Sequence, residues 1–179
     1  MRSQKGFTMI ELLVVTILVS ALVYIAVPRL RSSTDFNIKS ASRSLTGTIK
    51  YLYNEAAFKK EMYRLVFDVD RDEYWVEVLV NNEYLVTADY LKQRRRLPSG
   101  VHFQSVLTER NAARSSTLGQ ELDYILFLPT GYVEPAAIHL ESESGDNFTI
   151  QTKPYTGGTR VYNEYVNVLD GGQYAPGYQ

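Results

Sequence analysis

The chain has 179 residues and is close to neutral, with 19 Lys and Arg against 20 Asp and Glu. It has no cysteine, which excludes disulfides and thiolate metal sites without excluding an oxidising compartment. Residues 29–114 carry 15 basic and 11 acidic side chains, whereas residues 115–179 carry 2 and 8. We therefore expect one basic surface and one acidic surface.

The first predicted element is a membrane-length helix behind a short basic leader, residues 1–6. An apolar run over residues 7–27 follows the leader and ends before Pro28. At about 1.5 Å per residue this run spans about 31 Å, the thickness of a hydrocarbon core. Its one charge, Glu11, would cost roughly 2.5–3.5 kcal/mol at the centre of a membrane helix and less near the end. We therefore expect the Glu11 carboxylate to meet a cation.

Two simpler interpretations of this segment stay open at this point. A secretory signal peptide would explain the basic residues Arg2 and Lys5. However, the apolar run exceeds the usual length of about 7–15 residues, and residues 24–29 lack a small-x-small cleavage site. A plain single-span anchor would make Glu11 incidental.

The N-terminal sequence carries a family resemblance. Residues 5–15, KGFTMIELLVV, resemble the class III leader junction of type IV pilins and of the pseudopilins of type II secretion. Met9 stands where leucine is commoner in that family. Pro28, the helix bend, lies where the family places a bending proline.

The resemblance implies how this segment is processed and used. A prepilin peptidase would cut between Gly6 and Phe7 on the cytoplasmic side and N-methylate Phe7. Glu11 of an incoming subunit would then neutralise the new Phe7 amine of a neighbour. Because an unpaired buried charge is costly, this pair would set the register of a helical fibre, which makes Glu11 an assembly residue.

Residues 29–60 continue the helical pattern as an amphipathic segment. Apolar residues recur every three or four positions, and polar residues fill the other faces. We expect this stripe to pack against a sheet, with Pro28 bending the junction with the membrane segment. The stripe comprises Ile38, Ala41, Leu45, Ile49, Leu52 and Ala56.

Residues 61–162 change to a period of two. Strands are expected at 64–68, 73–80, 83–86, 101–106, 124–127, 137–141, 147–152 and 159–162. Short strands after one long helix predict an α+β fold with an antiparallel β domain, in one sheet or two packed sheets. This architecture is pilin-like.

The β region carries a second resemblance. Residues 97–101 (LPSGV), 127–131 (FLPTG) and 156–161 (TGGTRV) resemble the C-terminal region of H-type minor pseudopilins. That group includes minor pilins that help to initiate type IV pili. The usual Thr-Gly-Arg-Val pattern is interrupted by Gly158 and Thr159. Generic β-turns in another pilin subclass remain the alternative.

Few residues suggest catalysis or metal binding. His102 and His139 each stand alone in a strand-like segment, which favours wall or surface positions over metal ligation. Two acidic clusters lack the order of a calcium loop. These clusters are Glu141, Glu143 and Asp146, and Asp68, Asp70 and Asp72. We expect no catalytic residue, no metal site and no cofactor.

A basic run could contact phosphates or an acidic partner; it contains Lys92, Arg94, Arg95 and Arg96. Some minor pilins of this group bind DNA for uptake. Nucleic-acid binding usually needs several basic clusters with stacking aromatics, and the last third of this chain is acidic. A solvated loop or a contact for an acidic subunit is therefore favoured over DNA.

Residues 163–179 form a Tyr- and Gly-rich tail that includes Tyr165, Tyr174 and Tyr178. The tail is too short of apolar residues to form a core element. Tyrosines are common interface residues, so the tail is either a docking segment or a disordered end.

The two resemblances imply an H-type minor pseudopilin, a structural protein of type II secretion and not an enzyme. Its helix would anchor it in the bacterial inner membrane as a single span, with the C-terminal domain in the periplasm. It would then assemble near the tip of the pseudopilus and support the export of folded proteins. Expected partners are other pseudopilins, major and minor, prepilin peptidase and the inner-membrane secretion platform. The alternatives are a minor pilin that primes type IV pilus assembly and a DNA-binding uptake pilin.

Overall fold

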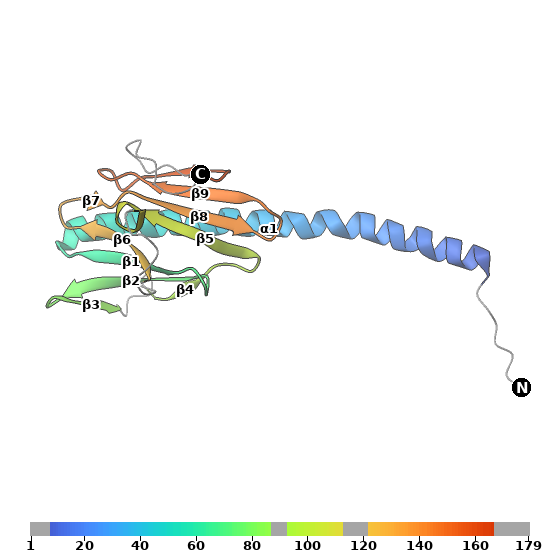
Figure 1. Cartoon of the computed structure of the whole chain (residues 1–179), viewed down its shortest axis with the longest axis horizontal. Helices are drawn as coiled ribbons and strands as arrows, with labels where there is room; N and C mark the ends of the chain where they lie inside the picture. Colours follow the sequence, from blue (N-terminus) through green and yellow to red (C-terminus); the bar gives the residue numbers. More distant parts are fainter. Residues whose placement is uncertain (1–7, 87–92, 113–121, 167–179) are drawn as a thin grey trace, which may run out of the picture.

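A 51-residue helix, α1 (Met9–Lys59), carries a β domain on its C-terminal half, while its N-terminal half projects away from that domain (Figure 1). The computed structural model describes residues 8–86, 93–112 and 122–166, with the backbone alone for residues 25–35. The helix is continuous through position 28, so Pro28 does not end it. It ends at Lys60, whose left-handed backbone (φ 59°) stops the helical hydrogen-bond ladder.

The predicted apolar stripe of α1 forms the centre of the core. None of its six residues, from Ile38 to Ala56, is more than 2% exposed. Four of them are fully buried Ile and Leu side chains, which together place one continuous face of the helix against the sheets. Burial of each such side chain stabilises the fold by about 1.5–3 kcal/mol.

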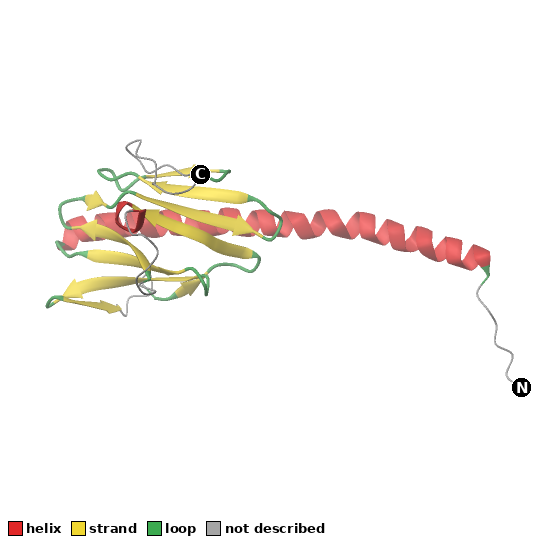
Figure 2. Ribbon diagram, in the orientation of Figure 1, coloured by secondary structure: helices red, strands yellow, loops and turns green. Residues whose placement is uncertain are grey.

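The β domain consists of two antiparallel sheets, which decides between the one-sheet and two-sheet expectations (Figure 2). The six-stranded sheet has the order β3-β2-β1-β6-β7, and β4 also pairs with β2. Its strands are β1 (Tyr63–Asp68), β2 (Glu73–Val80), β3 (Glu83–Val86), β4 (Arg95–Arg96), β6 (Asp123–Leu128) and β7 (Tyr132–Val133).

The four-stranded sheet has the order β10-β9-β8-β5 and also packs on α1. Its strands are β5 (Val101–Thr108), β8 (Ala136–Ser142), β9 (Asn147–Thr152) and β10 (Thr159–Tyr162), and the short helix α2 (Glu109–Ala112) follows β5. The register between β5 and β8 shifts between Phe103 and Ser105. This irregularity bends β5 locally.

Aromatic side chains join the two sheets near the turn end of β1. The Phe103 ring of β5 meets the Phe67 ring edge-on, with centroids 5.5 Å apart. It meets Tyr74 of β2 in the same geometry at 6.2 Å. Such edge-to-face pairs add about 0.5–1.5 kcal/mol beyond area burial. The sheets and α1 therefore share one core.

Candidate assembly site

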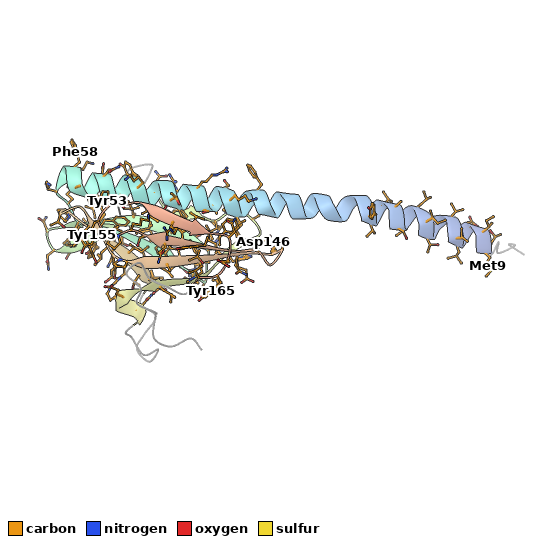
Figure 3. All side chains as sticks on the ribbon, turned by 90° about the horizontal axis from the view of Figure 1, so that it is seen from above. Met9, Tyr53, Phe58, Asp146, Tyr155 and Tyr165 are labelled. Atoms are coloured by element: carbon orange, nitrogen blue, oxygen red, sulfur yellow. The ribbon has the colours of Figure 1, made fainter. Side chains whose placement is uncertain are left out.

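The N-terminal half of α1 presents an apolar surface on every side (Figure 3). Its large apolar side chains between positions 9 and 23 are 46 to 91% exposed. They are Met9, Ile10, Leu12, Leu13, Val14, Val15, Ile17, Leu18, Val19, Leu22 and Val23. A helix that is apolar all round is suited to lipid or to a bundle of other helices, not to water.

The two hydroxyl side chains in this stretch are satisfied inside the helix. Thr16 Oγ1 donates to the Leu12 carbonyl at 2.6 Å, and Ser20 Oγ donates to the Thr16 carbonyl at 2.7 Å. Such back-bonding leaves neither hydroxyl in need of water. Within the described parts of the chain, no helix combines the length and hydropathy needed to cross a membrane.

Glu11 forms a capping box at the start of α1. The Glu11 backbone N–H donates to Thr8 Oγ1 at 3.3 Å, and the Thr8 N–H donates to Glu11 Oε2 at 3.4 Å. The carboxylate thus satisfies a free N–H and lies at the positive end of the helix dipole. Among the described residues it has no ion-pair partner. Gly6 and Phe7, the predicted cleavage and methylation residues, lie outside the described residues, so their roles stay predictions.

The basic run folds back onto β2. Arg94 Nη1 lies 3.2 Å from Glu73 Oε2, and Arg96 Nη2 lies 3.1 Å from Glu73 Oε1. The Arg94 guanidinium also lies over the Trp75 ring, 4.1 Å from its centroid. Two of the predicted contact cations therefore share one carboxylate of their own chain. Lys92 lies outside the described residues.

The two histidines hold loops and strands in place. His102 Nδ1 lies 2.7 Å from Asp72 Oδ2, and this hydrogen bond raises the pKa of His102. Asp72 also accepts from the Phe103 N–H at 2.8 Å, so the β1–β2 turn is fastened to β5. His102 is thus a surface residue, as the sequence predicts.

His139 lies fully buried and ties the start of the tail to the four-stranded sheet. Its Nδ1 lies 2.9 Å from Ser105 Oγ, its Nε2 lies 3.0 Å from the Val166 carbonyl, and its ring stacks on Tyr165 at 4.1 Å. Thr149 Oγ1 donates to the Glu164 carbonyl at 2.7 Å and anchors the same segment. Burial lowers the pKa of His139, so the neutral ring is the form that fits this place. Tyr174 and Tyr178 lie outside the described residues.

The acidic clusters serve turns. In the β8–β9 turn, Asp146 Oδ2 accepts from Ser144 Oγ at 2.8 Å. In the β1–β2 turn, Asp68 Oδ1 accepts from the Arg71 N–H at 3.1 Å. Over the described ranges, no group of three His, Asp or Glu side chains is placed to hold a metal ion.

The turn before β10 locks that strand to α1, a contact that the sequence does not reveal. Tyr53 Oη donates to the Tyr155 carbonyl at 2.9 Å, and Lys50 Nζ donates to the Thr156 carbonyl at 3.0 Å (Figure 3). Gly157 has φ +58°, and a Cβ there would lie 2.1 Å from Tyr53 Cγ. Gly157 of the TGGTRV motif thus allows the turn before β10 to approach α1 closely.

Comparison with known proteins places these features in context. Residues 1–26 match the family model of the prokaryotic N-terminal methylation motif. The chain is 30% identical over 151 residues to type II secretion system protein H of Pseudomonas aeruginosa, which covers 78% of this chain and 84% of the relative.

Two solved structures of the minor pseudopilin EpsH from the type 2 secretion system of Vibrio cholerae share the fold. One has a TM-score of 0.54 at 15% identity and covers 71% of this chain and 97% of that chain. The other has a TM-score of 0.56 at 14% identity and covers 72% and 94%. The predicted pilin-like fold is confirmed.

Proposed function

Because this chain belongs to the family of type II secretion system protein H, we propose that it lies near the tip of a periplasmic pseudopilus and supports the export of folded proteins. As a family member it is a minor pseudopilin of type II secretion, a structural subunit that assembles with other pseudopilins. The observation that carries this conclusion is the similarity to protein H, which extends over 151 residues and covers 78% of this chain.

Prepilin peptidase is the proposed processing enzyme, cutting between Gly6 and Phe7 and methylating the Phe7 amine. The methylation-motif match over residues 1–26 supports this step. Cleavage would leave a short N-terminus, because α1 begins at Met9 with Thr8 as its cap. Gly6→Ala should impair leader removal, and intact-mass measurement of the purified protein would detect the retained leader.

The proposed role of Glu11 is to pair with the Phe7 amine of a neighbouring subunit. The apolar surface around it on α1 suits a bundle of such helices, in which an unpaired carboxylate would be costly. In the single chain Glu11 caps its own helix. We propose that assembly adds the neighbour's ammonium group to this carboxylate. Because Glu11 needs the Phe7 amine of a neighbour, its presence supports a position below another subunit. A subunit at the extreme tip would lack that partner.

The proposed location is the inner membrane, with residues 7–28 as a single span and the β domain in the periplasm. The leader motif and the membership of this chain in the family of type II secretion system protein H support this location. The inner-membrane secretion platform is the proposed partner at the base of the fibre.

In-cell crosslinking of the full-length tagged protein tests the function, with captured partners identified by mass spectrometry. We expect other pseudopilins and inner-membrane secretion components. A processing-deficient Gly6→Ala strain is the control, because unprocessed subunits should not enter a fibre. Capture of a major pilin with pilus-assembly components instead would contradict type II secretion and assign the chain to priming of type IV pili.

A further inference from the structure

One face of α1 carries a row of three cations without an ion pair among the described residues; one of them, Lys50, also holds the turn before β10 through the Thr156 carbonyl. Lys39, Arg43 and Lys50 follow one another at intervals of four and seven residues, which places them on the same face of the helix. All three are exposed. No acidic residue occurs between positions 36 and 54. We call these three side chains the basic ridge; it extends about 16 Å along the helix axis.

The ridge is flanked by two hollows that meet at Gly47. The larger hollow, about 560 Å³, lies between the ridge and the four-stranded sheet, with Phe148 and Val161 on its sheet side. The smaller, about 240 Å³, lies between Tyr51 of α1 and Arg95 of β4. A Cβ at Gly47 would meet no atom within 4 Å, so the helix surface between the two hollows is open to solvent.

The cations of this region differ from four arginines of the domain that are paired with glutamate. Arg64, Arg94, Arg96 and Arg110 each have a glutamate partner. Of the ion pairs among the described residues, none includes a ridge cation or Arg95. Lys50 donates to a backbone carbonyl, which leaves its charge without a counter-ion. The surface thus has net positive charge beside an apolar hollow.

We propose that the basic ridge docks an acidic polypeptide segment of a neighbouring fibre subunit, with an apolar side chain of that segment in the hollow over Phe148 and Val161. This inference rests on the proposed function, because it needs a fibre with neighbours. Carboxylates along the segment complement the ridge. The apolar hollow lies beside β10, an edge strand of the four-stranded sheet, and Val161 on that strand is 42% exposed. The hollow could therefore take an aliphatic or aromatic anchor residue.

Other anionic partners fit this surface less well. If the N-terminal half of α1 enters a membrane, the helix axis crosses the lipid surface. Because the ridge runs along that axis, its three cations lie at different heights above the membrane, and a flat lipid surface cannot contact all three. Single-stranded nucleic acid uses exposed aromatic faces for stacking. Phe148, the aromatic ring in the larger hollow, is only 8% exposed and forms its wall, so the hollow itself offers no stacking platform.

A photo-crosslinking experiment in cells tests the inference with the full-length protein. A photoreactive phenylalanine at position 47 has the open space it needs. We expect it to capture an acidic segment of another pseudopilin. Lys39→Glu/Arg43→Glu should lower that capture about tenfold, equivalent to about 1.4 kcal/mol. The matched control, Lys60→Glu/Arg71→Glu, changes charge equally at two exposed residues outside the ridge and should leave capture unchanged.

A second photoreactive probe at Leu18, on the exposed apolar half of α1, separates failure of the ridge inference from failure of the proposed function. Suppose that the probe at Leu18 captures pseudopilins. If the probe at position 47 then captures no partner, or captures only a non-acidic segment, a phospholipid or a nucleic acid, the ridge inference is wrong while the proposed function stands. Capture at position 47 that survives the charge reversal also overturns the inference. If neither probe captures a pseudopilin, the proposed function itself fails.

Discussion

Replacement of Gly157 by alanine should destabilise the protein far more than an ordinary turn substitution. The left-handed backbone at φ +58° costs a residue with a Cβ about 1–2 kcal/mol. The added methyl would also lie 2.1, 2.4 and 2.6 Å from Tyr53 Cγ, Cδ1 and Cβ, atoms at the base of the side chain that cannot swing aside. Overpacking of this kind costs about 1–3 kcal/mol.

Displacement of Tyr53 carries a further cost. Its hydroxyl would lose the 2.9 Å hydrogen bond to the Tyr155 carbonyl, worth about 0.5–1.5 kcal/mol. The three contributions give an expected loss of about 2.5–6.5 kcal/mol in the free energy of unfolding for Gly157→Ala. Tyr53→Ala in the same chain should recover only the part of the steric cost that comes from the ring, because the Cβ at position 53, 2.6 Å from the added methyl, is still present.

Two other glycines provide matched controls. Gly145→Ala has a similar left-handed backbone (φ +87°) but nothing within 4 Å, so it should cost only about 1–2 kcal/mol. A Cβ at Gly158 would meet Thr156 Oγ1 at 3.2 Å and Lys153 Cδ at 3.7 Å, so Gly158→Ala should cost less than about 1 kcal/mol. Urea unfolding of full-length protein in detergent, followed by fluorescence of the single tryptophan, Trp75, measures all three. If Gly157→Ala costs no more than Gly145→Ala, the clash with Tyr53 is not real.

Three further predictions concern the site. Glu11→Ala should leave insertion and leader removal intact, lose the Glu11 half of the capping box while Thr8 keeps the cap, and abolish recovery in sheared fibres; normal incorporation would contradict the pairing argument. Burial lowers the pKa of His139 below its ordinary value of 6.5, so the unfolded chain binds more protons and the free energy of unfolding should fall as pH drops through 6.5. Because the raised pKa of His102 acts in the opposite direction, the measurement uses a His102→Gln background, and His139→Gln should flatten the curve; an unchanged slope would refute the assignment. Serine at positions 94–96 should leave retention of full-length protein on DNA unchanged, whereas a large, salt-sensitive loss would revive nucleic-acid binding.

Strands of four or more residues could be predicted from the sequence, whereas the two-residue strands could not. The eight-residue strand β2 (Glu73–Val80) has the bounds that its pattern indicates. The two-residue strands β4 and β7 carry no period, because two residues cannot show alternation. The basic run was therefore expected as a solvated loop or a partner contact, whereas two of its arginines pair with Glu73 across β2 and β4.

In the candidate site, local features could likewise be predicted from the sequence, and features that depend on long-range strand pairing could not. The leader motif and Glu11 are local features, and the Thr-x-x-Glu spacing of Thr8 and Glu11 is itself a capping signal that the sequence contains. The spacing of Lys39, Arg43 and Lys50 is also visible in the sequence. Whether those charges have acidic partners depends on which strands lie beside α1, and strand order is set by long-range pairing such as that of β1 with β6.

The unbroken course of α1 also has a mechanical meaning. At 1.5 Å per residue its 51 residues make a strut of about 77 Å, with the β domain fixed along one end by a continuous apolar seam. Axial load on the free end would therefore reach both sheets without passing through a loop. Flexure would concentrate at Pro28, the only proline in the helix, where one hydrogen bond of the ladder is absent. We therefore expect a subunit that is stiff along its length and bends at Pro28, between its two halves.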